Sequence, residues 1–279
     1  MTNEQRLARL VSHLKNAGLN FLVMGGHAVR YYGVDRNTND FDFCAGVVST
    51  EELRELLKGV AELDGAKEGP SWRPDEFARF EIGKLADGRE EWLEFWVRNH
   101  LLDRFEELAS RQEKGSYGGG EVAFLSLNDL LRSKETERES DWSDIALLEE
   151  VLDARNLSAA SNLAGLEKFL TELRSRRGFA RGIAAGCFAD RAVVERAAVR
   201  CRHPVSFAFL TPFLGELPAP PSLRAPIDSM LLEKLRNVTI GETQHLAIVE
   251  VVRRAYKRRA MEIDRQDKQA KLGRGNDPF

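Results

Sequence analysis

The sequence predicts an α/β or α+β domain with a mixed sheet over about the first 150 residues, followed by a largely helical region. In the first half, short apolar runs typical of strands alternate with apolar stripes of helical spacing, whereas the pattern beyond residue 141 is almost wholly helical. With 279 residues, of which 43% are hydrophobic and 30% charged, the chain can form one large core or two smaller ones. This composition excludes a disordered, collagen-like or disulfide-scaffold protein.

Helix and strand signals alternate from the first residues onward. Leu7, Leu10, Val11 and Leu14 lie on one helical face, and Gly18 ends that helix. The elements expected up to residue 60 are a helix over 4–16, a strand over 21–24, a short helix over 27–32, a strand over 40–44 and a helix that begins at Ser49 or Thr50.

A hairpin is expected in the middle of this half. Asp87-Gly88 is a strong hairpin-turn dipeptide, and it lies between two strand-like segments, 77–83 and 91–97. Residues 69–74 are typical of a loop, and residues 115–120 of a flexible turn. A last strand over 122–125 and a helix that begins after Ser126 complete the half.

The second half predicts helices with one interruption. Prolines between His203 and Pro226 indicate extended or irregular chain there. We expect a first domain over 1–152, a helical region over 153–263 and a basic tail over 264–279. From Arg253 to the last residue, nine Lys and Arg stand against four Asp and Glu, which suits either RNA binding or a solvated helix end.

Targeting and cysteine signals are weak. No apolar run approaches the ~20 residues of a membrane helix, and the polar start shows no signal peptide, so we expect a cytoplasmic protein without membrane contact. Cys44, Cys187 and Cys201 have no paired spacing, which predicts buried thiols rather than a zinc site or a disulfide framework.

The informative chemistry lies in Gly25-Gly26 and in Asp40 and Asp42. On a strand the two aspartates project from the same face, and paired carboxylates of this kind suit Mg²⁺ together with substrate phosphates. Two glycines between a strand and a helix let backbone N–H groups approach a phosphate. Taken singly, a diglycine marks many turns and an Asp-x-Asp pair is usually a solvated strand face, but the combination favours a function.

The segment over 21–43, FLVMGGHAVRYYGVDRNTNDFDF, resembles the signature of the DNA polymerase β-type nucleotidyltransferase superfamily. The alanine-containing helix, Arg36-x-Thr38 and Asp40-x-Asp42 are similar to small prokaryotic nucleotidyltransferases, including toxin components of the abortive-infection type. Downstream, Lys134, Arg138, Asp141 and Asp144 resemble a helix pair that often follows in that group, so the resemblance covers about residues 5–152.

The resemblance implies a nucleotidyltransferase fold and the transfer of a nucleoside monophosphate from an NTP such as ATP to an acceptor hydroxyl. It implies Mg²⁺ or Mn²⁺ held by Asp40, Asp42 and a third carboxylate from a later strand. Glu94 is the candidate, since it shares a strand face with Trp92 and Trp96, although the family more usually has aspartate there. Glu91 and Glu81 stay open as alternatives.

Other residues have supporting roles in this interpretation. Gly25 and Gly26 would cradle the phosphates, Arg36 and Lys134 would offset their charge, and Thr38 would orient one of them. Surface ion pairing explains Arg36 and Lys134 equally well, and the charges over 132–144 also fit a solvated helix.

The acceptor stays open at this level. A toxin-like enzyme would modify tRNA or another RNA and would have a cognate antitoxin as partner, whereas an enzyme for a small molecule such as an antibiotic would need a pocket. A protein side chain is a third acceptor. From another class, a catalytically silent, antitoxin-like binding partner would keep the fold, but it would have no reason to maintain Asp40 and Asp42.

Overall fold

The computed structural model describes residues 1–60, 63–71, 73–85, 87–136, 138–214, 235, 245–255 and 257. The chain divides into two compact units, Met1–Lys134 and Glu135–Phe279, so the division falls before the expected boundary at residue 152. The prolines from Pro218 to Pro226 and the tail from Arg258 lie outside the described residues. No described helix is long and apolar enough to cross a lipid bilayer.

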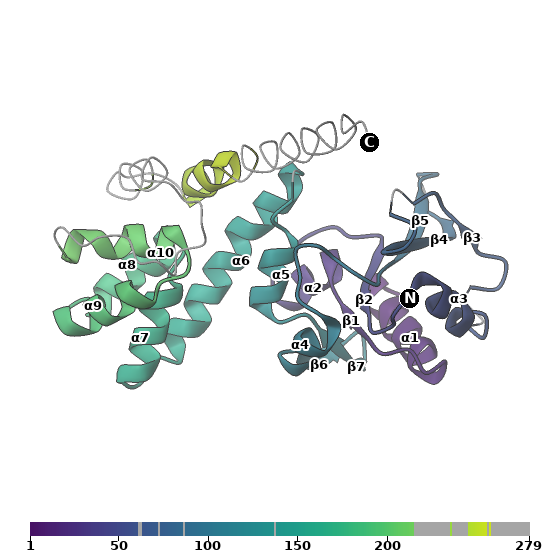
Figure 1. The fold of residues 1–279 in the computed structure, drawn as a ribbon, viewed down its shortest axis with the longest axis horizontal. Helices are drawn as coiled ribbons and strands as arrows, with labels where there is room; N and C mark the ends of the chain where they lie inside the picture. Colours follow the sequence, from purple (N-terminus) through teal and green to yellow (C-terminus); the bar gives the residue numbers. More distant parts are fainter. Residues whose placement is uncertain are drawn as a thin grey trace, which may run out of the picture. The chain divides into compact units, whose positions relative to one another are not determined.

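The first unit is built on a seven-stranded mixed sheet with the order β3-β4-β5-β2-β1-β7-β6, which confirms the expected fold class (Figure 1). β2 runs parallel to β5 and β1 parallel to β7, while the other neighbours are antiparallel. The strands are β1 Phe21–Val23, β2 Phe41–Ala45, β3 Lys67–Glu68, β4 Phe77–Lys84, β5 Glu90–Trp96, β6 Glu113–Tyr117 and β7 Gly120–Phe124.

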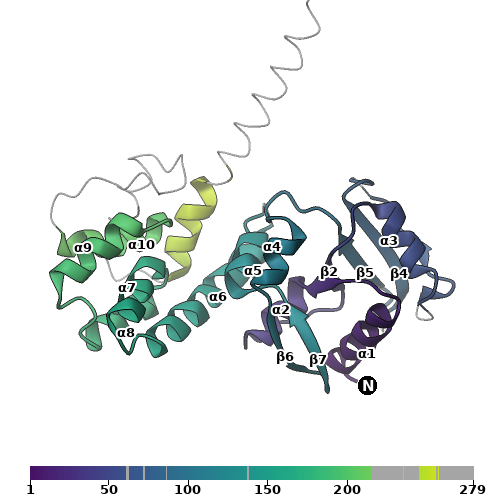
Figure 2. The ribbon, with the colours of Figure 1, turned by 60° about the horizontal axis from the view of Figure 1, so that its bottom comes forward.

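Helices on this sheet begin where the sequence offers an N-cap. Thr2 and Gln5 form a capping box, and the side chains of Ser49 and Ser126 accept from backbone N–H groups three residues on. α1 packs against β6 and β7, and α2 packs against β2 and α5 (Figure 2). The helices are α1 Asn3–Asn16, α2 Gly25–Tyr31, α3 Thr50–Leu57, α4 Phe105–Ser110 and α5 Leu127–Ser133.

Phenylalanine rings from adjacent strands fill the core of the sheet. Phe41, Phe43 and Phe95 are all less than 2% exposed. The Phe43 ring stacks on Phe95 with centroids 5.3 Å apart, and Phe21 meets Phe43 edge-on at 5.2 Å. Because side chains alternate along a strand, burying these rings turns the residues between them to the other face.

The second unit is helical in its described part. Its helices are α6 Glu139–Ser158, α7 Leu163–Glu172, α8 Arg176–Ala184, α9 Arg191–Arg200 and α10 Pro204–Leu210, followed by the 3₁₀ helix η2 Thr211–Phe213. Asp153 of α6 is fully buried, and it accepts from the Arg174 N–H at 3.0 Å and from the Ser175 N–H and hydroxyl, both at 2.6 Å. One carboxylate therefore holds the chain between α7 and α8.

Two local expectations were wrong. Residues 115–120 are not a flexible turn, since β6 continues through Tyr117 and only Gly118 and Gly119 make the turn, with φ of +62° and +89°. The prolines after His203 do not all force irregular chain, because Pro204 opens α10, where its missing N–H removes no helix hydrogen bond. The three cysteines are free and buried, as expected.

We predict that Asp153→Ala lowers the free energy of unfolding by about 3 kcal/mol, because it leaves buried donors of Arg174 and Ser175 without an acceptor. Asp190→Ala is the matched control: Asp190 caps α9 at an exposed position, so its loss costs about 1 kcal/mol. Urea unfolding measures both. Equal losses in the two variants would contradict the role of Asp153.

Candidate active site

The structure brings the three predicted carboxylates to adjacent strands. Asp42 of β2 lies directly opposite Glu94 of the parallel strand β5. Asp40 immediately precedes β2, and its Oδ1 accepts weakly from the Trp92 N–H at 3.4 Å. Since Phe41 and Phe43 point into the core, the aspartates share the opposite face with Glu94, and we call Asp40, Asp42 and Glu94 the carboxylate row.

The carboxylates of the row repel one another. Burial raises the pKa of Asp40, and the neighbouring Asp42 raises it further. Burial and Asp42 also raise the pKa of Glu94. Three carboxylates on one half-buried face favour any cation that can share their oxygens, because the cation offsets both effects.

The donor set fits Mg²⁺ or Mn²⁺ bound together with a substrate. Among the described residues, no three His, Cys, Asp or Glu side chains converge as a ready-made metal cage. Mg²⁺ seldom uses such a cage, because it keeps several waters and binds through one or two carboxylates and substrate phosphates. The carboxylates of Asp42 and Glu94, at directly opposed positions of β2 and β5, offer that kind of partial site.

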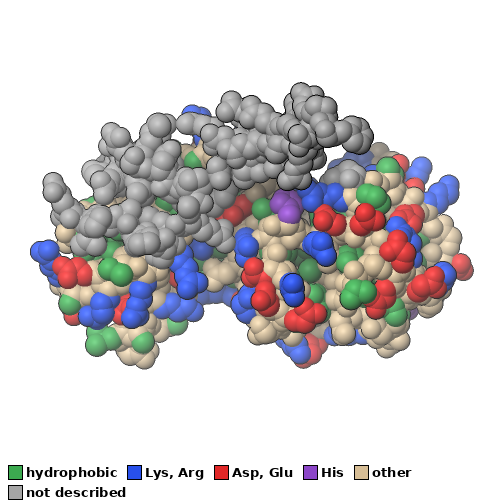
Figure 3. All heavy atoms as spheres, viewed as in Figure 1, with side chains coloured by type: hydrophobic (Ala, Val, Ile, Leu, Met, Phe, Trp, Pro, Cys, Tyr) green, Lys and Arg blue, Asp and Glu red, His purple; other side chains and the backbone are tan. Residues whose placement is uncertain are grey.

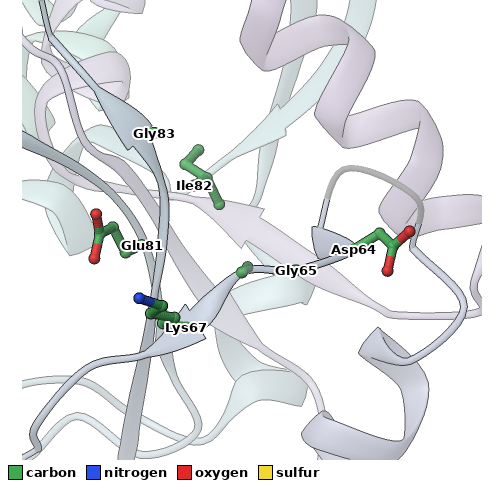
Figure 4. A pocket seen from close by; sticks show the side chains of 7 residues that line it. Asp64, Gly65, Lys67, Glu81, Ile82 and Gly83 are labelled. Atoms are coloured by element: carbon green, nitrogen blue, oxygen red, sulfur yellow. The ribbon is translucent and has the colours of Figure 1, made fainter.

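The two alternative third carboxylates lie elsewhere. Glu91 is 3% exposed and forms an ion pair with Arg6 of α1. Glu81 stands opposite Trp92, one strand further from β2, and it lines a small cavity of about 240 Å³ that Lys67 of β3 also lines (Figure 4). Only Glu94 of the three is in register with Asp42, which supports it as the third carboxylate.

The two glycines let the loop and strands approach closely. Gly25 has φ +62°, and a Cβ there would overlap the Asp42 carboxylate. A Cβ on Gly26 would overlap the Thr38 hydroxyl. α2 begins at Gly25 rather than at His27, and its N-cap Met24 provides no side-chain cap. The first N–H groups of α2 therefore lie next to the carboxylate row.

Arg36 and Thr38 lie on the loop that leads from α2 into β2. The Arg30 guanidinium donates to the Arg36 carbonyl at 3.1 Å, and the Asn3 amide donates to the Thr38 carbonyl at 3.0 Å. Thr38 is thus held beside Gly26. Lys134 is 4% exposed at the C-cap of α5, the helix that packs on α2. The phosphate-binding roles of all three stay predictions.

Arg138, Asp141 and Asp144 belong to the second unit. Asp141 is fully buried, and it accepts from the Arg138 guanidinium at 2.8 Å and from the Thr136 hydroxyl at 2.5 Å. These contacts fix the start of α6, so a local structural role accounts for Asp141.

The sequence interpretation missed Arg79 of β4. Arg79 stands opposite Glu94 in the β4–β5 pairing, and its guanidinium carbon lies 4.3 Å from the centre of the Trp92 ring. The signal was the Asp87-Gly88 turn, which pairs the two strands. However, the register of the β4–β5 pairing shifts between Glu81 and Gly83. Counting back from the turn therefore gives the wrong partner for Glu94.

His27 belongs to the core rather than to the open site. It is fully buried, its ring stacks on Phe41 at 5.1 Å, and its Nδ1 lies 3.0 Å from the Tyr117 hydroxyl. Burial lowers the pKa of His27 to about 4, so the imidazole is neutral at physiological pH.

No protein-family model matches the sequence, and no curated protein is similar enough to count as a relative. Among solved structures, an antigenic nucleotidyltransferase-like protein from Paracoccidioides brasiliensis is 17% identical, covers 54% of this chain and 77% of its own, and has a TM-score of 0.37. The lincosamide antibiotic adenylyltransferase LnuA with bound lincomycin is 16% identical over 54% of this chain and 98% of its own, with a TM-score of 0.38.

A third structure, JHP933 from Helicobacter pylori, is 13% identical and covers 95% of this chain and 97% of its own, with a TM-score of 0.38. The first of these proteins is described as nucleotidyltransferase-like and the second as an adenylyltransferase. Because these TM-scores are low, the carboxylate row and the glycine turn are the features that bear on the function of this chain.

We predict that Gly25→Ala lowers the free energy of unfolding by roughly 3 kcal/mol, since a strained φ is combined with overlap on Asp42. Gly33→Ala is the control: Gly33 has φ +90° but open space around it, so only about 1 kcal/mol of backbone strain is expected. Thermal and urea unfolding would distinguish the two variants. An equal loss of unfolding free energy would show that the overlap with Asp42 adds nothing to the backbone strain.

The buried His27 predicts a pH dependence. Because its folded pKa is depressed, the unfolded chain binds more protons between pH ~4 and ~6.5, and stability falls as pH falls through that window. Between pH 7.5 and 5.0 we expect the wild type to lose about 2 kcal/mol more than His27→Gln, measured by urea unfolding. Parallel losses in both proteins would assign the acid sensitivity to other groups.

Proposed function

We propose that this protein is a metal-dependent nucleotidyltransferase that transfers a nucleoside monophosphate from an NTP to an acceptor hydroxyl and releases pyrophosphate. The observation that carries the proposal is the carboxylate row lying against the Gly25-Gly26 turn at the start of α2. Carboxylates that bind a divalent cation next to the first backbone N–H groups of a helix suit a substrate that is itself a metal–triphosphate complex.

The donor NTP would bind on the β1 side of the row. Gly25 and Gly26 bring backbone N–H groups toward the β and γ phosphates, and the Thr38 hydroxyl beside Gly26 would donate to one of them. Arg36 and Lys134 are the candidates to offset the charge that builds up as pyrophosphate leaves.

Asp40, Asp42 and Glu94 would hold Mg²⁺ or Mn²⁺. When bound, the cation supplies Lewis-acid stabilisation of charge on the transferred phosphoryl group. The β2–β5 pairing holds the backbones of Asp42 and Glu94 in register, which limits the rearrangement that the proposed site needs.

The reaction is an in-line displacement at the α-phosphorus. A bond forms from the acceptor oxygen to phosphorus, the bond from phosphorus to the bridging oxygen of the β-phosphate breaks, and the hydroxyl proton leaves to solvent. The chain's contribution is to hold the donor between the glycine turn and the carboxylate row so that attacking and leaving oxygens stand on opposite sides.

For the acceptor, we propose RNA, with tRNA in a toxin–antitoxin setting as the specific form and a cognate antitoxin as partner. The basic residues Arg253, Arg254 and Lys257, which begin the basic C-terminal segment, support this choice. A small-molecule acceptor is the second candidate, because a cleft of about 450 Å³ adjoins Asp40 and is large enough for a drug-sized molecule.

A silent, antitoxin-like binding protein is the alternative from a different class. Such a protein has no need for Asp42 beside two carboxyls, Asp40 and Glu94, whose pKa values burial and that neighbouring charge raise. Incubating the purified protein with Mg²⁺ and each α-labelled NTP, with and without total RNA, distinguishes these functions. Label in RNA supports the enzyme with an RNA acceptor, label only in an added small molecule supports the second candidate, and failure to bind any NTP supports the silent protein.

We predict that Asp42→Asn lowers the rate of label transfer at least about 1,000-fold, or about 4 kcal/mol in the activation barrier, because one charged oxygen ligand is lost at the centre of the row. Asp87→Asn, in the exposed hairpin turn, removes the same charge without effect. Far-UV circular dichroism and thermal unfolding check that both variants fold. Full activity of Asp42→Asn would exclude the proposed site.

A further inference from the structure

The Arg79–Trp92 pair lies beside the carboxylate row, and the proposed donor site does not use it. The guanidinium carbon of Arg79 lies over the Trp92 indole, 4.3 Å from the ring centre, a cation–π contact. A Cβ on Gly69 would overlap the Trp92 ring, so the chain after β3 also presses against this pair. The pair is therefore held in a fixed position at the surface of β4 and β5.

Arg79 keeps unused hydrogen-bonding capacity. It lies close enough to Glu94 to oppose the rise in the pKa of that carboxyl, yet the part of the chain that the structure describes offers its side chain no hydrogen bond or ion pair. Its Nε is buried without an acceptor. An arginine has five N–H donors in a rigid fork that matches the oxygens of a phosphate.

The strand order separates two sides of the row. Along β4-β5-β2-β1, the glycine turn follows β1 on one side of Asp42, whereas Trp92 and Arg79 lie on β5 and β4 on the other. In an in-line displacement the attacking group and the leaving pyrophosphate occupy opposite sides of the phosphorus. If the triphosphate lies at the glycine turn, the acceptor must enter over β5 and β4.

A cleft lies on this acceptor side. It has a volume of about 450 Å³, and Asp40, Trp92 and the hairpin residue Arg89 line it. On the face drawn in Figure 3, basic and acidic side chains are interspersed over the first unit, without a broad basic patch. Arg79 and Trp92 lie next to the carboxylate row.

We propose that Arg79 and Trp92 form the acceptor-binding shelf, and that the acceptor is a nucleotide unit whose phosphate binds Arg79 while its base stacks at Trp92. This inference rests on the proposed nucleotidyl transfer and deepens it. A nucleotide is the acceptor class that uses both groups, because a guanidinium fork binds phosphate and an indole stacks on bases of any identity. The free mononucleotide and the end of an RNA strand share this chemistry.

The test measures acceptor binding without turnover. The probe is a 5′-fluorescein hexaribonucleotide with a free 3′ hydroxyl, followed by anisotropy at several salt concentrations, and 5′-AMP serves as competitor. Binding of Mg²⁺ with α,β-methylene-ATP is measured in parallel by calorimetry. The variants are Arg79→Gln, Arg79→Lys and Trp92→Leu, with Lys84→Gln as a control that removes one exposed charge from the same hairpin.

We expect Arg79→Gln to weaken hexanucleotide binding about 10-fold and to reduce the slope of log K against log salt by about 0.7, the contribution of one single-strand phosphate contact. Arg79→Lys should keep the slope because it keeps the charge. Trp92→Leu should weaken binding about 10-fold with an unchanged slope, since it removes stacking alone. All variants should bind the ATP analogue as the wild type does, and Lys84→Gln should match the wild type throughout.

The proposal is overturned if the wild type binds neither the hexanucleotide nor 5′-AMP, or if Arg79→Gln and Lys84→Gln behave alike. It is also overturned if Arg79→Gln weakens the ATP analogue equally, which would place Arg79 on the donor side. A wild type that fails to bind Mg²⁺ and the analogue contradicts the proposed function itself. If 5′-AMP displaces the hexanucleotide at similar concentrations, the shelf binds a free nucleotide as acceptor. If only RNA displaces it, the acceptor is the end of an RNA strand.

Discussion

The side-by-side placement of Asp42 and Glu94 is the constraint on which the rest of the site depends. Two acidic side chains face each other across the parallel pair β2–β5, on a face that is half-buried. The fold tolerates this arrangement because phenylalanines on the opposite face anchor both strands in the core. Gly25 then allows Asp42 to lie against the start of α2, next to the first backbone N–H groups of that helix.

The placement of Asp42 beside Glu94 relates the order of the strands to the proposed reaction. The strand that carries Asp42 is flanked by the glycine turn after β1 on one side and by β5 and β4 on the other. A donor with a triphosphate and an acceptor with a hydroxyl need opposite approaches to one phosphorus. In the proposed reaction, the central position of β2 leaves one approach on each side, and Arg79 and Trp92 lie on the side that the motif over 21–43 does not cover.

The sequence predicted those features of the site whose structure depends on residues close together in the chain. The glycine turn, the Asp-x-Asp strand and the Asp87-Gly88 hairpin all formed where their residue types require it, and alternation placed Glu94 on the face of Asp42. β6 was not predicted, because glycine at position 115 is typical of a turn. In the structure, the missing Cβ of Gly115 makes room for the Tyr31 ring. Arg79 was hidden because a register shift near the turn changes which β4 residue faces Glu94, and the choice of bulge is made by tertiary packing.

The central claim is that the carboxylate row binds a divalent cation jointly with a triphosphate. Electron paramagnetic resonance of Mn²⁺ titrated into the protein, with and without α,β-methylene-ATP, tests it most directly. The account predicts that the nucleotide analogue tightens Mn²⁺ binding at least about 10-fold beyond the binding by the analogue alone, because the phosphates complete a site that the protein leaves partial. Mn²⁺ binding that is absent, or that the analogue leaves unchanged, would contradict it.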